Sequence, residues 1–292
     1  MERTTPNTST NELLGYPMDT RLLILNADDF GMYPAINEAV VRTLTDGVVR
    51  STTLMTPCSG ALGAMRRLEN NPTIDFGVHL TVVNDLVHLR YGPLAPQHQV
   101  PSLMDEDGYF YRTERIPEFL AVALLDELEI EFRVQIETVR TAGLKPTHLD
   151  WHCLHSGGRP DIFDMTMGLA KEYGLAVRVA QLPLNDTVRR HGLPTVDYGL
   201  MDSYRVDTVG KPARYAQMLR DLPAGLSEWA VHPSLGSAES HAIDEGWPVR
   251  RADFDFMMST QAREIIQQEG ITVLSYKPLQ EIWRATFSGS LM

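Results

Sequence analysis

The sequence predicts a single closed or nearly closed β/α barrel of about seven parallel strands. Strand-like and helix-like segments alternate along most of the 292 residues, and polar clusters stand where apolar strands give way to loops. Strands separated by helices pair in parallel through right-handed crossovers. An open doubly wound sheet is the alternative, although no G-x-G-x-x-G follows the first strand.

The first third of the chain alternates strands and helices. An apolar run predicts a strand at 21–27, and apolar residues at spacings of three and four predict a helix at 35–44. A β-branched, Thr-rich run predicts a strand at 48–55. A helix at 61–68, with basic residues late in it as the helix dipole prefers, and a strand at 74–80 follow.

The middle of the chain contains a long interruption. Residues 82–114 include three prolines, and an insertion of this length is typical of a lid or a binding loop. Apolar spacing then predicts one long helix at 117–141. A strand at 147–151, a helix at 160–173 and a strand at 175–179 restore the alternation.

The last third is expected to complete the sheet. A second irregular segment at 183–210 precedes it. The pattern then predicts a helix at 213–222, a strand at 229–232 and a loop rich in Gly, Ser and Glu at 234–245. A helix at 252–269, a strand at 271–275 and a final helix at 278–284 follow.

We expect one folded domain at 19–292, with the insertion at about 82–114, after a disordered polar tail at 1–18. The tail lacks the apolar region of a signal peptide, and no apolar run is long enough to span a membrane. Cys58 and Cys153 are the only cysteines, which favours a reducing compartment, so we expect a cytoplasmic protein. The net charge of −12, without a Lys/Arg-rich run, argues against nucleic-acid binding.

Two adjacent carboxylates, Asp28 and Asp29, stand at the end of the first strand within Asn26–Gly31. Each loses hydration on burial and raises the pKa of the other, and a divalent cation is the usual group that offsets this repulsion. An Asp–Asp turn is the alternative interpretation of the motif taken alone. Because successive strand residues point to opposite faces, the two carboxylates need not have the same role.

Histidines follow two other strands. His148, Asp150 and His152 alternate, so a strand directs all three to one face. Asp29, His79 and His152 would form a set of two histidines and one carboxylate, which leaves coordination positions open for water and substrate. A hydrogen-bonded histidine network in the core is the alternative.

These motifs resemble those of the YdjC/ChbG-like carbohydrate deacetylases. The matching segments are Asn26–Gly31, Gly77–Leu80, Thr147–His152 and Val231–Pro233, in order, within about residues 21–284. The resemblance implies a distorted β/α barrel related to the NodB-type polysaccharide deacetylases. It also implies a metal-dependent hydrolase that removes the N-acetyl group from a small N-acetylated amino sugar or chitooligosaccharide.

Carried over by position, the resemblance implies that Asp29, His79 and His152 bind one divalent metal ion. Asp28 would be the general base and His232 the general acid. Mg²⁺ and Zn²⁺ are the first candidates, with Mn²⁺ and Co²⁺ as alternatives. Another single-metal barrel hydrolase or isomerase acting on a sugar or sugar phosphate is the alternative function. A sugar-binding protein without catalysis is disfavoured, because a binder needs neither Asp28 nor His232.

The sequence departs from the family pattern at Leu154, where members often have a histidine. This departure puts a fourth histidine and a close match in substrate in doubt. It leaves open the roles of His148, Asp150 and His155. Arg159 is expected to contact an anionic group or, more simply, to take part in packing.

Some further residues have expected roles. Cys153 should face away from His152 on a strand, as a small buried thiol. Tyr109, Phe110 and Tyr111 in the insertion are candidates for a surface that stacks on sugar rings. The expected partner is a small N-acetylated sugar, with no nucleic acid and no membrane. A homodimer is compatible with the sequence.

Overall fold

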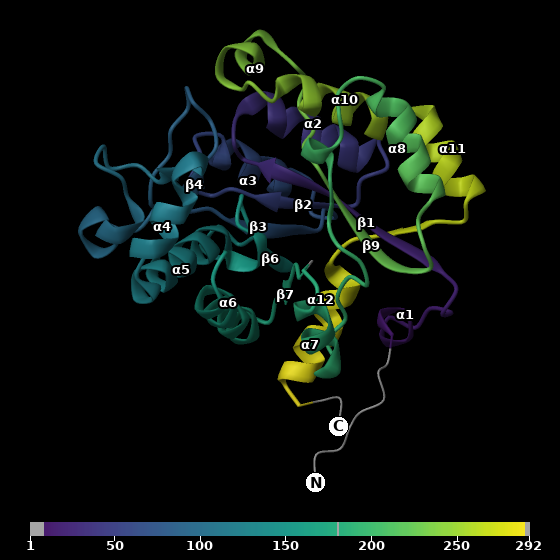
Figure 1. The fold of residues 1–292 in the computed structure, drawn as a ribbon, viewed down its shortest axis with the longest axis horizontal. Helices are drawn as coiled ribbons and strands as arrows, with labels where there is room; N and C mark the ends of the chain where they lie inside the picture. The colour runs from purple at the N-terminus through teal and green to yellow at the C-terminus, as the bar shows by residue number, and fades with distance from the viewer. Residues whose placement is uncertain (1–8, 180, 290–292) are drawn as a thin grey trace.

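The computed structural model describes residues 9–179 and 181–289, and a parallel β-sheet forms its centre (Figure 1). The sheet has the order β7-β6-β3-β2-β1-β9-β8, and β10 pairs with β1 beside this path. Its strands are β1 (Arg21–Phe30), β2 (Ser51–Leu54), β3 (Phe76–Leu80), β6 (His148–Trp151), β7 (Ala176–Val177), β8 (Met201–Asp202), β9 (Gly225–Val231) and β10 (Thr272–Leu274).

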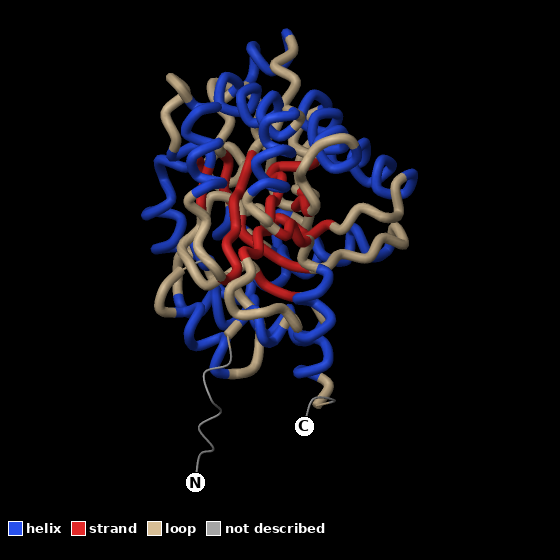
Figure 2. Tube along the Cα trace, turned by 90° about the vertical axis from the view of Figure 1, so that its right-hand side faces the viewer, coloured by secondary structure: helices blue, strands red, loops and turns tan. Residues whose placement is uncertain are grey.

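The sheet is curled, and helices surround it (Figure 2). Within the described residues, the edge strands β7 and β8 do not pair with each other, so the barrel is open on that side. All pairings in the sheet are parallel. The prediction of a distorted β/α barrel with about seven parallel strands is therefore confirmed.

The helices pack their apolar faces against the sheet or against one another. On one side α8, α10 and α11 lie together, and α10 also contacts α2; on the other side α5, α6 and α12 form a layer (Figure 1). The helices are α1 (Thr10–Leu13), α2 (Pro34–Thr45), α3 (Ala61–Asn70), α4 (Ile116–Val122), α5 (Leu125–Thr141), α6 (Pro160–Tyr173), α7 (Leu184–Arg190), α8 (Lys211–Arg220), α9 (Ala238–Ile243), α10 (Trp247–Met257), α11 (Thr260–Gln268) and α12 (Lys277–Phe287).

Strand β1 forms the centre of the sheet. The run Leu22–Leu25 is completely buried, as expected for a strand covered on both faces. β9 pairs along β1 on one side, while β10 and β2 share the other side. The pairing with β2 shifts register between Ala27 and Phe30, and Asp29 has a φ of 67°. This irregularity at the carboxyl end of β1 is a β-bulge, a device that redirects side chains.

The insertion at 82–114 is built from short pieces. β4 (Val83–Asn84) and β5 (Tyr111–Arg112) form a separate two-stranded parallel sheet. Short 3₁₀ turns occupy Gln97–Gln99 and Pro101–Leu103. From α5, the fully buried Glu131 accepts hydrogen bonds from the backbone N–H groups of Leu94 and Ala95, which fastens the middle of the insertion to the barrel.

Several elements differ from the sequence predictions. The single helix expected at 117–141 is two helices, α4 and α5, and the one expected at 252–269 is also two, α10 and α11. Ser259 explains the second break, because its side chain accepts a hydrogen bond from Ala262 N and begins a new helix. α7, β8 and α9 lie in segments predicted to be irregular, where no apolar periodicity marks them.

Part of the segment at 1–18, which was expected to be a disordered tail, is folded. Residues 1–8 lie outside the described part of the chain, but Ser9 caps α1 through a reciprocal capping box with Glu12. The buried Thr10 donates a hydrogen bond to Thr195 O, which attaches α1 to the barrel. In the described residues, no helix has the length and apolar character needed to cross a membrane.

Candidate active site

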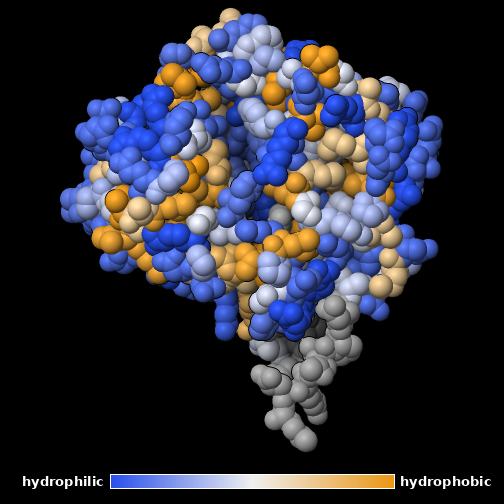
Figure 3. Space-filling model, in the orientation of Figure 1, coloured by the Kyte–Doolittle hydropathy of each residue, from blue (hydrophilic) through white to orange (hydrophobic). Residues whose placement is uncertain are grey.

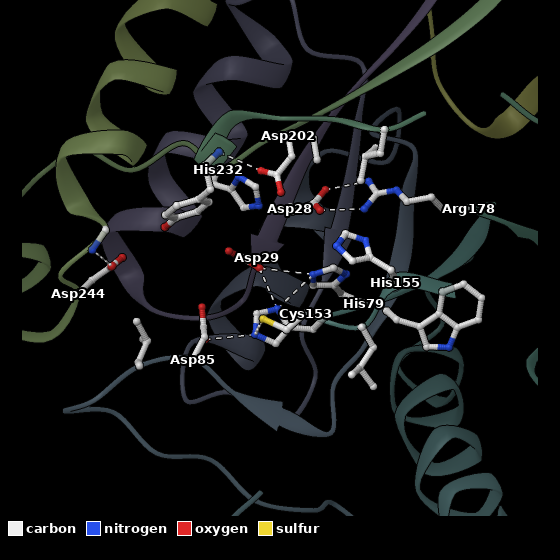
Figure 4. Close-up of a pocket in the computed structure, with 18 of the residues that line it drawn as sticks. Asp28, Asp29, His79, Asp85, Cys153, His155, Arg178, Asp202, His232 and Asp244 are labelled. Carbon is white, nitrogen blue, oxygen red and sulfur yellow. Dashed lines mark hydrogen bonds and ion pairs between the residues drawn. The ribbon is translucent and has the colours of Figure 1, made fainter. Parts of the chain in front are cut away.

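A cavity of about 410 Å³ opens at the carboxyl ends of the strands. Asp28 and Asp29 come from β1, His79 from β3, His152 from just after β6 and His232 from just after β9. The volume lies within the usual range for small-molecule sites. Figure 3 shows a recess near the middle of this face, with hydrophilic side chains beside it, and Figure 4 shows the residues that line the cavity.

Asp29, His79 and His152 converge on one point. Asp29 Oδ1 lies 3.4 Å from His79 Nε2 and 3.2 Å from His152 Nδ1, and the two nitrogens are 3.3 Å apart. Metal–ligand bonds of about 2.0–2.2 Å place neighbouring ligand atoms about 2.8–3.1 Å apart around an octahedral ion and about 3.3–3.6 Å apart around a tetrahedral one. The three atoms therefore fit one face of a coordination polyhedron.

Asp150 supports His79 from behind. Its Oδ1 lies 2.6 Å from His79 Nδ1, and the Asp150 side chain is completely buried. Burial alone would lower the pKa of His79, but the neighbouring Asp150 carboxylate raises it to about 9. A carboxylate behind a histidine fixes the ring orientation and leaves the other nitrogen free to bind a metal. An ion at this site must displace a proton from His79, so its affinity should rise with pH.

Asp28 is paired with Arg178. Arg178 Nη1 and Nη2 donate hydrogen bonds of 2.8 Å to the two carboxylate oxygens of Asp28 (Figure 4). Asn26 Nδ2 donates another of 2.7 Å. Burial would raise the pKa of Asp28, but the guanidinium outweighs this effect and lowers the pKa well below its usual value. Arg178 is itself neutralised by Asp150 and Glu228. Asp28 is therefore an ionised carboxylate that faces the cavity at neutral pH.

The two adjacent aspartates both line the cavity, whereas simple strand alternation would direct them to opposite faces. The β-bulge and the positive φ of Asp29 turn its side chain to the same side as Asp28. Asp29 Oδ2 accepts a hydrogen bond of 2.8 Å from Arg250, a completely buried residue of α10. Burial would raise the pKa of Asp29, but Arg250 lowers it. Each aspartate thus has its own arginine partner.

His232 is half-buried on the opposite wall of the cavity from His79 (Figure 4). Its Nδ1 lies 2.8 Å from Ser203 Oγ, and its ring meets Tyr204 edge to face at 4.7 Å. The backbone N–H of His232 donates to the buried carboxylate of Asp253. These contacts fix the ring with Nδ1 occupied, which leaves Nε2 as the free nitrogen.

Four residues whose roles the sequence left open are now placed. His148 stacks on Tyr276, with ring centroids 3.7 Å apart, and takes no part in the cluster of Asp29, His79 and His152. Asp150 supports His79, as described above. His155 is exposed and lines the cavity, and its Nε2 lies 3.0 Å from Arg205 Nη2. Arg159 donates to the carbonyls of Leu120 and Ala123 and pairs with the carboxylate of Asp161, so it has both a packing role and an anionic partner within the fold.

Two sequence expectations are wrong. Cys153 is exposed and lines the cavity, with Sγ 3.3 Å from His152 Nε2, because its φ of 57° turns the side chain away from strand geometry. Phe110 and Tyr111 are buried in the insertion and do not line the cavity. Tyr109 is partly exposed but packs under the guanidinium of Arg90. The insertion borders the cavity through residues 85–87 instead.

A curled parallel β/α barrel with carboxylates and histidines gathered at the carboxyl ends of its strands is an architecture typical of enzymes. The chain belongs to the YdjC-like family, whose model matches residues 22–268. It is 30% identical to a carbohydrate deacetylase of Thermoanaerobacter pseudethanolicus, over 89% of this chain and 100% of the relative. It is 38% identical to a carbohydrate deacetylase of Brevibacillus brevis, over 88% of this chain and 99% of the relative.

A solved structure agrees with this assignment. The crystal structure of a candidate cellobiose-phosphate cleavage protein from Enterococcus faecalis V583 superposes with a TM-score of 0.76. The two chains are 26% identical, and the match covers 89% of this chain and 99% of the other. The two proteins thus share a fold over nearly the whole chain.

Proposed function

We propose that the protein removes the N-acetyl group from a small N-acetylated amino sugar or chitooligosaccharide, with one divalent ion held by Asp29, His79 and His152. The observation that carries the proposal is the ionised Asp28 beside this triad of ligand atoms, in one cavity. The names of the curated relatives supply the substrate class. Two nitrogen donors and one oxygen donor suit Zn²⁺ or another transition metal, while open positions filled by water tolerate Mg²⁺.

The chain's own residues divide the proton transfers between them. When bound, a divalent ion makes a water molecule more acidic and polarises the acetamide carbonyl. Asp28 accepts a proton as the water oxygen forms its bond to the carbonyl carbon. His232 donates a proton to the sugar nitrogen as the carbon–nitrogen bond breaks, so that acetate and the free amine leave. Arg178 keeps Asp28 ionised and orients its carboxylate.

The test is an acetate-release screen with metal-stripped and metal-reloaded protein. We expect release from N-acetylated mono- and disaccharides by the reloaded protein alone, and little from polymeric chitin, because the insertion borders the cavity. Phosphorylated sugars form a separate arm of the screen. Product formation without acetate, as free phosphate or an isomerised sugar, would replace this proposal with the alternative barrel hydrolase or isomerase.

Ser203→Ala tests the assignment of His232 as the acid. We expect kcat to fall about tenfold, because a misoriented acid loses part of the contribution of a hundredfold or more that acid–base catalysis makes. Metal content and KM should not change, since Ser203 is neither a member of the ligand cluster nor a residue that lines the cavity. Ser227→Ala, a buried serine of β9, is the matched control. An unchanged kcat in Ser203→Ala would show that the His232 ring does not depend on this hydroxyl.

A further inference from the structure

Each histidine of the candidate metal site has a carboxylate behind it, but the two carboxylates come from different parts of the fold. Asp150 lies on β6 in the barrel and supports His79. Asp85 lies just after β4 in the insertion, and its Oδ1 is 3.1 Å from His152 Nε2 (Figure 4). The insertion therefore brings a carboxylate to the candidate metal site.

The position of Asp85 determines which nitrogen of His152 can bind a metal. His152 Nδ1 faces Asp29 Oδ1 and His79 Nε2, whereas Nε2 faces Asp85. A neutral imidazole carries its proton on one nitrogen only, so a carboxylate acceptor at Nε2 keeps the proton there. The lone pair then remains on Nδ1, where the other two ligand atoms converge.

Asp85 is itself held in place. The hydroxyl of the buried Tyr91 donates a hydrogen bond of 2.8 Å to Asp85 Oδ1, and the same hydroxyl oxygen lies 3.2 Å from His152 Nε2. Tyr91 precedes the segment that Glu131 of α5 fastens to the barrel. A chain of contacts thus runs from α5 through the insertion to the back of His152.

We propose that Asp85, held by Tyr91, is the positioning residue of His152, and that the insertion tunes the affinity of the metal site through it. The inference rests on the proposed function, because it takes the triad of Asp29, His79 and His152 as the metal site. Asp85 acts from behind the ring and does not bind the ion. Cys153 Sγ, 3.3 Å from the same His152 Nε2, is a neighbour of this contact and not its acceptor.

The test compares Asp85→Ala and Asp85→Asn with Asp107→Ala. Asp107 is the matched control, since it lies in the same insertion, is exposed and forms an ion pair with Arg90 at the protein surface, away from His152. The Zn²⁺ dissociation constant is measured by chelator competition on metal-stripped full-length proteins, together with their thermal unfolding. We expect Asp85→Ala to weaken binding about 10–100-fold, the usual effect of removing such a partner. Asp85→Asn should weaken it less, because the amide oxygen still accepts a hydrogen bond. Asp107→Ala should not change it.

A spectroscopic measurement separates positioning from folding. Nitrogen–proton correlation spectra of the metal-free protein, recorded at a pH high enough that the imidazole of His152 is neutral, should show this ring protonated at Nε2, and as a mixture of tautomers in Asp85→Ala. If Asp85→Ala binds Zn²⁺ as tightly as the unaltered protein, or keeps the same tautomer, the inference is overturned. If Cys153→Ser weakens binding as much as Asp85→Ala does, the ion is bound on the Nε2 side of the His152 ring, and the inference also fails. If the unaltered protein binds no ion, the proposed function itself fails.

Discussion

Asp28→Asn is expected to lower the rate of acetate release by about a hundredfold or more while the metal stays bound. The physical reason is that an amide cannot accept a proton from water at neutral pH. Asp28 lines the cavity but is not one of the three atoms that converge in the candidate metal site, so its loss should leave that site intact. Metal content and kcat, measured on the same preparation, check both parts of this expectation.

Asp29→Asn is the matched variant, because it makes the same chemical change one residue further along the chain. It should lose the metal, since a neutral amide oxygen is a poorer ligand than the carboxylate oxygen that lies near both histidines. His232→Ala should behave like Asp28→Asn, with metal retained and catalysis lost. If Asp28→Asn is metal-free and Asp29→Asn is only slow, the two roles are reversed. Full activity in all three variants would disprove the proposed mechanism.

Much of the fold is predictable from the sequence because the buried strands are short apolar runs that end in polar motifs. Leu22–Leu25 identified β1, and the positions of His79 and His152 beyond apolar runs identified their place at the carboxyl ends of β3 and β6. β8 was not predictable, because it has only two half-buried residues, Met201 and Asp202. Its existence depends on pairing with β9, a tertiary effect.

The side-chain directions at the cavity were less predictable. Strand alternation gave wrong directions for Asp29 and Cys153, which both have positive φ. A sequence contains no clear signal for such a residue unless it is glycine. Both lie next to candidate catalytic or ligand residues, where backbone strain is often found. The departure from a regular strand is thus part of how the site is built.

The roles of the charged partners of the site could not be assigned from the sequence, for a different reason. Arg178 and Arg250 lie 150 and 221 residues from their aspartate partners, so no local pattern connects them. Asp85 stands in an irregular segment without periodicity. A single arginine within an apolar strand, as Arg178 in 175–179, was the one signal available, and it has many structural explanations. Such partners can be identified only from the folded structure, where residues distant in the sequence are in contact.

His79→Ala and His152→Ala are each expected to weaken metal binding by more than about a hundredfold, beyond the effect of removing a supporting carboxylate. Each change leaves two of the three converging atoms, and the loss of one imidazole removes a direct bond to the ion. His155→Ala is the matched control, because this histidine also lines the cavity but pairs with Arg205 and lies outside the cluster.

Bound metal per protein molecule, measured after reloading with Zn²⁺, is the readout, and thermal unfolding of the metal-free proteins shows whether each variant is folded. Both substituted histidines are buried, so some loss of stability is expected from the cavity that alanine leaves. That loss of stability is already present in the metal-free protein. The increase in unfolding temperature on addition of Zn²⁺ therefore measures metal binding separately from it. Unchanged stoichiometry in both variants would disprove the ligand assignment. Loss of the ion in His155→Ala, with retention in His79→Ala, would place the metal at the outer edge of the cavity.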